Sequence, residues 1–177
     1  MKPLVCDIPY PSTDNLTTDV RSGQIISFAY ATLNSELTAV LQYSFHEIYM
    51  QNFNPEDADT LMAIAIAEMK HLHILGDAME KLGVMPKYVQ YPNSKMYFDT
   101  SAVSQSTTPT KMIMDDIQGE LNAIAEYKKM IFVLKNDDVA AIIQRIVLDE
   151  ELHLETLKQM LEKYAAPKNL QKFTPKC

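Results

Sequence analysis

Apolar side chains recur at intervals of three and four residues along most of this 177-residue chain. This spacing places them on one face of a helix, so it predicts amphipathic helices that each have one buried stripe. The segment 84–108 contains prolines, serines and tyrosines and lacks the period, and residues 166–177 have the pattern of a coil. The periodic segments predict four helices, at about 19–51, 55–82, 109–135 and 137–164.

Residues with known preferences for helix ends stand at the borders of these segments. The first helix has candidate caps in Thr17, Thr18 and Asp19, and the fourth in Asn136, Asp137 and Asp138, because a short polar side chain accepts a hydrogen bond from the first turn. Pro55 and Pro109 suit first turns, where the missing amide hydrogen would have no partner in any case. Gly83 is suited to end the second helix, since glycine readily adopts the left-handed conformation that often follows a helix.

The lengths of the connections predict how the helices are arranged. Only a few residues join the first helix to the second and the third to the fourth, so each pair is expected to form an antiparallel hairpin. The segment 84–108 can extend to roughly 80 Å, and a helix of about 27 residues is only about 40 Å long. We therefore expect one all-α domain over 1–177, a four-helix bundle whose two hairpins are joined by a long crossover. A plain up-and-down bundle with a loose central loop is the alternative.

The two halves of the chain repeat a pattern of polar residues. Residues 36–43 read ELTAVLQY and residues 120–127 read ELNAIAEY, so each has a Glu followed seven residues later by a Tyr. Residues 68–71 and 150–153 both have the form ExxH. The repeat predicts that the two hairpins place the same chemistry at the same height of the bundle.

The repeated Glu and His residues fall in or beside the apolar stripes, where burial alone would favour leucine. Four carboxylates buried together would be strongly destabilising without compensation. Two divalent cations would neutralise them, and carboxylate oxygens with imidazole nitrogens and no thiolate suit iron or manganese. A helical bundle without metal is the alternative, but two ExxH motifs at matched spacing favour a metal centre. The predicted ligands are Glu36, Glu68, His71, Glu120, Glu150 and His153.

Composition narrows the class of protein further. The net charge is −7 at pH 7, so no nucleic-acid partner is expected. No apolar run reaches the roughly 18 residues of a membrane span, and the N-terminus lacks the apolar core of a signal peptide. We therefore expect no membrane partner and a cytoplasmic location. With only 4 Gly, the chain also lacks the glycine-rich loops typical of nucleotide-binding α/β folds.

Three segments resemble the ferritin-like superfamily of bacterioferritin, rubrerythrin and manganese catalase. SELTAVLQY is similar to the first-helix motif of bacterioferritins, and AEMKH and LDEELH are similar to their second- and fourth-helix motifs. The resemblance covers about residues 20–163 and implies a ferritin-like four-helix bundle with two iron or manganese ions per chain. It implies the same six ligands, with Glu68 and Glu150 bridging or chelating.

The chain also departs from individual members of that superfamily. Rubrerythrins usually add a domain with CxxC pairs, which this chain lacks, and carry a further carboxylate where it has Ala123. Met69 stands at the haem-ligand position of bacterioferritins. Because the chain has 11 Met, packing is the interpretation we favour, and Met69 is a lower-ranked haem candidate.

Other polar residues are candidates for supporting the centre. Tyr43 and Tyr127 lie two turns beyond the repeated glutamates, where they could bond the opposite carboxylates or supply an electron or a proton; a structural role is favoured. Asp149 could orient the imidazole of His71 or face solvent. Two histidines outside the motifs are expected at the surface or in packing: His46 and His73.

These residues and the resemblance predict a dinuclear iron or manganese oxidoreductase that acts on hydrogen peroxide or O₂, by catalase or peroxidase chemistry linked to oxidative stress. A bacterioferritin-like ferroxidase that stores iron is the alternative. An electron donor, where one is needed, is left unnamed by the sequence. A homodimer is expected, whereas a shell of 12 or 24 subunits would favour storage.

Overall fold

The structure is a computed structural model that describes residues 1–90, 92 and 94–165. In this part of the chain the architecture is all-helical, and the only pairing of extended backbone is an isolated bridge between Val89 and Tyr97. The predicted coil 166–177 lies outside the described residues. The elements are α1 (Val20–Ala31), α2 (Glu36–Met50), α3 (Pro55–Lys81), the 3-10 helix η1 (Thr100–Ala102), α4 (Pro109–Val133) and α5 (Asp137–Ala165).

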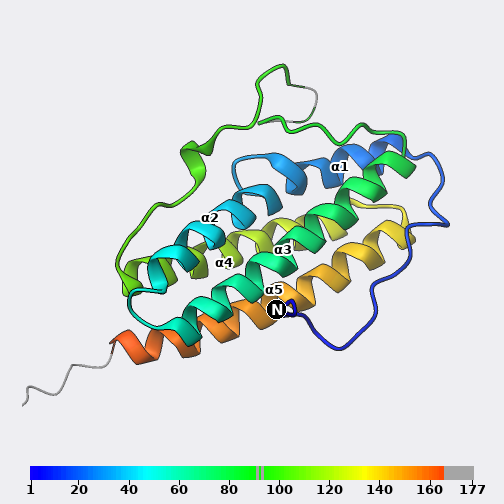
Figure 1. The fold of residues 1–177 in the computed structure, drawn as a ribbon. Coiled ribbons are helices and arrows are strands. Elements are labelled where there is room, and N and C mark those ends of the chain that lie inside the picture. Colours follow the sequence, from blue (N-terminus) through cyan, green and yellow to red (C-terminus); the bar gives the residue numbers. More distant parts are fainter. Residues whose placement is uncertain (91, 93, 166–177) are drawn as a thin grey trace, which may run out of the picture.

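The helices form a four-helix bundle of two antiparallel hairpins, as predicted (Figure 1). In the first hairpin α1 and α2 follow one another along α3, and in the second α4 packs against α5. The third and fourth predicted helices, 109–135 and 137–164, are observed as α4 and α5 with ends shifted by at most two residues. None of the described helices combines the length and apolar content that a membrane crossing needs.

The prediction of one continuous helix over 19–51 is wrong, because the chain breaks between α1 and α2. The break falls at residues 32–35, where hydroxyl groups compete with the helical hydrogen bonds. Ser35 caps α2 by accepting from the amide of Thr38. The hydroxyl of Thr38 donates to the carbonyls of Thr32 and Leu33, at 3.1 and 3.0 Å. The side chains thus satisfy backbone groups that a break would otherwise leave without partners.

The other helix ends follow the expected chemistry. Asp19 accepts from the amide of Ser22 at the start of α1, and Asn136 accepts from the amide of Val139 at the start of α5. Gly83 follows α3 with a φ of 83°, in the left-handed region. Its amide donates to the carbonyl of Glu80, and the next amide donates to that of Met79, which is a Schellman motif.

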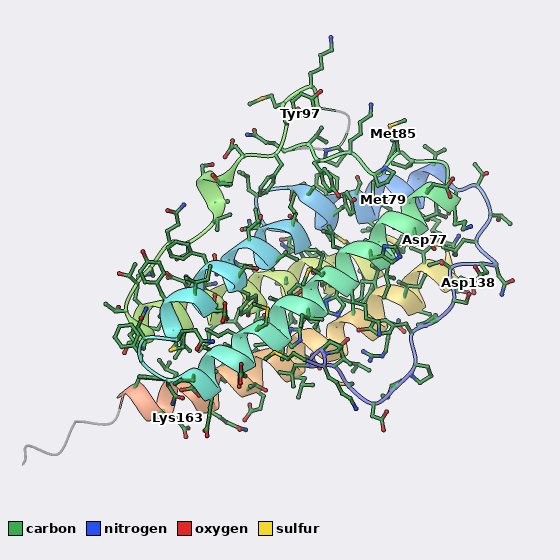
Figure 2. All side chains as sticks on the ribbon, in the orientation of Figure 1. Asp77, Met79, Met85, Tyr97, Asp138 and Lys163 are labelled. Atoms are coloured by element: carbon green, nitrogen blue, oxygen red, sulfur yellow. The ribbon has the colours of Figure 1, made fainter. Side chains whose placement is uncertain are left out.

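The segment between α3 and α4 runs along the length of the bundle, as its length predicted (Figure 1). Tyr88 stacks on Tyr30 of α1, with ring centroids 5.5 Å apart, and the amide of Ser104 donates to Gln42 of α2. Met85 and Tyr97, labelled in Figure 2, are 71 % and 80 % exposed. The crossover is therefore attached at separate points and leaves much of its apolar surface in solvent.

The apolar core is divided into two clusters by a layer of polar residues. One cluster gathers α1 with the C-terminal half of α3 and includes Ile26, Leu75 and Ile143. The other gathers α2 with the N-terminal half of α3 and includes Leu61 and Ile113. At the end of the bundle beside this second cluster, Lys163 of α5 (Figure 2) forms an ion pair of 2.6 Å with Asp57. The two clusters pack the helices together on both sides of the polar layer.

Candidate metal centre

The polar layer contains all six residues that the repeat singled out. Each is at most 4 % exposed. They form two overlapping groups that share two glutamates, and within each group one ligand atom per residue lies within 4.8 Å of the others. The first group is Glu36, Glu68, His71 and Glu150, and the second is Glu68, Glu120, Glu150 and His153.

Two glutamates that the repeat makes equivalent reach the centre from different local structures. Glu36 is the first residue of α2, directly after the Ser35 cap, whereas Glu120 lies in the interior of α4. The break between α1 and α2 therefore ends just where Glu36 enters the layer. Glu68 and His71 lie one turn apart on α3, and Glu150 and His153 do so on α5, so each ExxH pair faces the same way.

Several buried atoms of the layer face one another without forming hydrogen bonds. Glu68 Oε1 lies 3.0 Å from His153 Nδ1, yet neither atom has a hydrogen-bond partner among the described residues, and the same holds for Glu150 Oε1. Native proteins rarely leave such atoms unpaired. Lone pairs turned toward a shared point are what cation ligands require, and oxygen with imidazole suits iron or manganese. The arrangement fits a pair of divalent ions.

Both imidazoles present the same nitrogen to the carboxylates. His71 Nδ1 lies 3.2 Å from Glu68 and 3.1 Å from Glu150, while its Nε2 lies 3.1 Å from Asp149 Oδ2. His153 Nε2 lies 2.8 Å from the carbonyl oxygen of Leu4. In the neutral rings the Nε2 hydrogens are therefore donated outward, and the Nδ1 lone pairs point into the layer.

The two tyrosines bond the opposite carboxylates, one of the alternatives that the sequence left open. Tyr43 of α2 donates to Glu120 of α4, and Tyr127 of α4 donates to Glu36 of α2. Burial, with the charge of Glu120, raises the pKa of Tyr43 well above its usual value, so the phenol keeps its proton. The pair ties the two hairpins together across the layer.

Burial and mutual repulsion shift the proton affinities of the layer. Burial, together with the charges of Glu68 and Glu150, raises the pKa of Glu36 and of Glu120 well above the usual range. Burial alone would lower the pKa of the histidines, but the carboxylates of Glu150 and Glu68 that face His153 outweigh it and raise the pKa of His153 to about 10. Without a metal, the layer therefore holds protons that a cation would have to displace.

A cavity of about 400 Å³ reaches the layer from the side of α2 and α4. It touches the four carboxylates and both tyrosines, but neither histidine lines it. Gly119 lies on its wall, and a Cβ placed there would meet only the side-chain nitrogen of Gln42, at 4.0 Å. The carboxylate side of the layer is thus open to a small molecule from one direction.

The opposite side is covered by the N-terminal segment 4–10, which we call the N-terminal strap. Its Leu4 amide donates to the carbonyl of Ala63, and its Cys6 amide donates to Asp149 Oδ1 at 2.7 Å. Arg145 of α5 donates to the carbonyls of residues 6 and 8, both at 2.8 Å. Sequence reasoning missed the strap because it has no periodicity, and only its contacts reveal it.

Asp149 is fully buried, so its alternative placement in solvent does not occur. Its Oδ1 accepts from Cys6 and lies 2.8 Å from Arg145, and its Oδ2 accepts from Tyr10 as well as facing His71. Burial would raise the pKa of Asp149, but the hydrogen bonds from His71, Tyr10 and Arg145 hold it well below its usual value. Asp149 is an anion beside a candidate ligand.

The remaining candidate residues from the sequence lie outside the layer and differ in their exposure. His46 is fully buried, which agrees with packing, one of the two roles expected for it from the sequence. Its Nδ1 lies 2.8 Å from Asp116, a buried carboxylate that the motifs did not indicate. His73 is exposed. Met69 is 44 % exposed on α3 and is not part of either ligand group.

Comparison with known families shows which family the chain belongs to. The family model described as a ferritin-like domain matches residues 30–166. The chain belongs to the ferritin-like family. Its sequence is 29% identical over 143 residues to a bacterioferritin of Streptomyces coelicolor, a match that covers 78% of this chain and 80% of the relative.

Solved structures agree with this ferritin-like fold. A manganese catalase from Anabaena superposes with a TM-score of 0.81 at 17% identity, over 97% of this chain and 85% of the catalase. A bacterioferritin from Mycobacterium tuberculosis superposes with a TM-score of 0.68 at 24% identity, over 84% and 88%. At these identities the likeness shows the shared architecture, and the chemistry has to be argued from the residues.

Proposed function

We propose that this ferritin-like protein is a dinuclear iron or manganese oxidoreductase that consumes hydrogen peroxide. The observation that carries the proposal is the pair of buried ligand groups that share Glu68 and Glu150. Four carboxylates match the charge of two divalent ions, and two shared glutamates match the bridges that such a pair needs. Glu36 with His71 and Glu120 with His153 would complete the two halves.

Bound iron or manganese would supply one-electron steps between the divalent and trivalent states. The protein's own residues would keep the carboxylates in position while charge changes. Tyr43 and Tyr127 restrain Glu120 and Glu36 by donating a hydrogen bond to one oxygen, which leaves the other oxygen free. The imidazoles are held in one tautomer by the acceptors behind them.

The cavity suits a small, uncharged oxidant. Peroxide removal by disproportionation balances without another reactant: one peroxide takes up two electrons and two protons to give two waters, and a second gives up two electrons and two protons as O₂. All four ligand carboxylates line the cavity, so an entering peroxide would reach the metal pair from this side. A peroxidase cycle would need an external electron donor instead.

A ferroxidase that handles iron is the second candidate, and the sequence relative favours it because that protein is named a bacterioferritin. The first candidate rests on the two ligand groups and on the cavity that reaches them, since the likeness to a manganese catalase shows the shared fold alone. Assembly size separates them in our proposal: a homodimer favours the peroxide-consuming enzyme, and a large shell that retains mineral favours storage.

The proposal is tested with purified protein loaded with manganese or iron. We expect it to consume hydrogen peroxide and to release one O₂ for every two peroxides, as followed by an oxygen electrode and ultraviolet absorbance. Metal-free protein serves as the control. Fully loaded protein that is inert to peroxide, but oxidises Fe(II) and retains it, would contradict the first candidate and support the second.

Gly119 gives a second test, because it forms part of the cavity wall. Gly119→Leu should lower kcat/KM for peroxide by at least about 10-fold without changing the bound metal, since the side chain would occupy the route to the carboxylates. Gly119→Ala is the matched control and should keep turnover. Both variants should be slightly more stable, by up to about 1 kcal/mol, because glycine is unfavourable inside a helix. Unchanged turnover in Gly119→Leu would show that peroxide uses another route.

A further inference from the structure

The internal repeat is broken at one buried position beside the metal centre. Glu68 of α3 and Glu150 of α5 are equivalent, so the residues before them, Ala67 and Asp149, are equivalent too. Both are fully buried. Asp149 can accept a hydrogen bond and carries a charge, whereas Ala67 can do neither with its side chain. The two candidate histidine ligands therefore have different neighbours behind them.

Behind His71 stands a carboxylate that is fixed from several sides. Asp149 Oδ2 lies 3.1 Å from His71 Nε2, and the hydroxyl of Tyr10 donates to that same oxygen. Tyr10 OH is also 3.2 Å from His71 Nε2. The ring of Tyr10 is held between two cations, with Lys70 Nζ and Arg145 Cζ each 4.2 Å from its centroid. The N-terminal strap thus fixes the acceptor that His71 uses.

Behind His153 stands a neutral group. With alanine at position 67, α3 supplies no side-chain acceptor, and the strap fills the position with the carbonyl of Leu4, 2.8 Å from His153 Nε2. That part of the strap is attached by the Leu4 amide to Ala63, at 3.0 Å. One segment therefore completes both histidines, but with an anion on one side and a backbone dipole on the other.

We propose that this difference makes the two metal positions unequal, so that the Glu36–Glu68–His71–Glu150 position binds its ion first, with Tyr10 as a positioning residue. The inference rests on the proposed function, since it assumes that the six residues hold two ions. A hydrogen bond to an anion draws the Nε2 hydrogen outward more strongly than a bond to a neutral carbonyl. It thereby makes Nδ1 the better electron donor and strengthens its bond to a cation.

The same difference has a consequence for the redox chemistry of the two positions. A stronger donor favours the higher charge of a bound ion, so His71 with Asp149 behind it would hold a trivalent ion better than His153 with its neutral carbonyl would. The two halves of the repeat would therefore differ in the charge they favour, because the strap and Ala67 remove its symmetry.

Stepwise titration of metal-free, full-length protein with Mn(II), followed by calorimetry, tests the proposal. The wild type should bind two ions in two steps of unequal affinity. Asp149→Asn should weaken the first step by about 10–100-fold, the cost typical of losing such an outer carboxylate, and leave the second within a few-fold. Tyr10→Phe should weaken the first step by less, because Asp149 keeps its charge but loses one restraint.

Tyr164→Phe is the matched control. Its hydroxyl also donates to a buried carboxylate, Asp57, at 2.6 Å, but at the far end of the bundle. It should lose stability much as Tyr10→Phe does and keep two unequal steps, which separates positioning from a general loss of packing. Equal steps in the wild type, or an equal loss in both steps of Asp149→Asn, would overturn the inference and leave the proposed function standing. Protein that binds no metal would overturn both.

Discussion

Replacing Glu120 with glutamine is expected to abolish binding of the second ion and, with it, peroxide turnover, while leaving the metal-free fold intact. Glu120 belongs to the ligand group that contains His153, and its loss removes a negative charge that a divalent ion needs. Losing an outer partner of a ligand already costs about 10–100-fold in metal affinity, so losing the carboxylate itself should cost more. Glu120→Ala should have the same effect on metal and activity.

The metal-free protein should tolerate this change because its fold favours the neutral form of Glu120. Burial and the charges of Glu150 and Glu68 raise the pKa of Glu120 well above its usual value. Glutamine is close in shape to a protonated glutamate, and its carbonyl oxygen can still accept from Tyr43. The free energy of unfolding should therefore change by no more than about 1 kcal/mol. If Glu120 served only in packing, replacing it would leave metal binding unchanged.

Elemental analysis, peroxide consumption and thermal unfolding of the metal-free protein together check this prediction. Glu155→Gln on α5 is the control, because Glu155 is exposed and bonds only Gln159 among the described residues. It should keep both ions and full turnover. A Glu120→Gln protein that still carries two ions per chain would contradict the assignment of Glu120 as a ligand.

Metal loading is expected to raise the melting temperature by about 10–20 °C, the largest change in stability that the structure predicts. An ion that binds only the folded protein at about 100 times its Kd adds roughly 2.7 kcal/mol, and two ions add roughly twice that. For a chain of this size, each kcal/mol moves the melting temperature by about 2–4 °C. The ligands in the polar layer come from all four helix positions of the bundle. Metal ions bound to them would link these helices together and so oppose unfolding.

The increase in melting temperature on metal loading should become larger as the pH rises. Burial would lower the pKa of His153, but the facing carboxylates of Glu150 and Glu68 outweigh it and raise this pKa from 6.5 to about 10, and burial raises the pKa of Glu36. A raised pKa stabilises the metal-free fold fully below the unfolded value, and for His153 this contribution is lost as the pH rises toward about 10. Protons also compete with metal, so metal affinity increases over the same range.

Calorimetry of metal-free and manganese-loaded protein at about pH 6 and about pH 8 measures both effects. The loaded protein should melt higher at both values, with the larger difference at the higher pH, and a chelator should reverse the gain. Proton release on metal binding, detected in buffers of different ionisation enthalpy, gives an independent check. A melting temperature that ignores metal, or a gain that shrinks with rising pH, would contradict the centre as described.

The parts of the fold that the sequence anticipated are those decided by neighbouring residues. The period of apolar positions predicts α3, α4 and α5, because each helix hydrogen-bonds within itself and only needs one apolar face. The end of α3 follows from Gly83 for the same local reason. The break before Glu36 was missed because the apolar period continues through it, while the hydroxyls of Ser35 and Thr38 act against the helix.

The candidate centre was anticipated to an unusual extent because its residues repeat. Two ExxH pairs and two glutamates at matched heights could be read from spacing alone, and the structure brings all six together. The depth of His46 and its pairing with Asp116 could not, since that pair joins α2 to α4 across the bundle and follows no motif. Tyr10 and the carbonyl of Leu4 were equally hidden, because the strap reaches α5 from the other end of the chain.

The sequence by itself determined that the six repeated Glu and His side chains face the interior and come in two matching sets, because helical spacing and repetition are properties of order along the chain. Only the tertiary structure decided how the two sets differ. Asp149 lies behind one histidine and a backbone carbonyl lies behind the other. Contacts between distant segments depend on how the strap crosses α3 and α5, and residue spacing does not predict that crossing. The electrostatic surroundings of each ligand are therefore a property of the folded bundle.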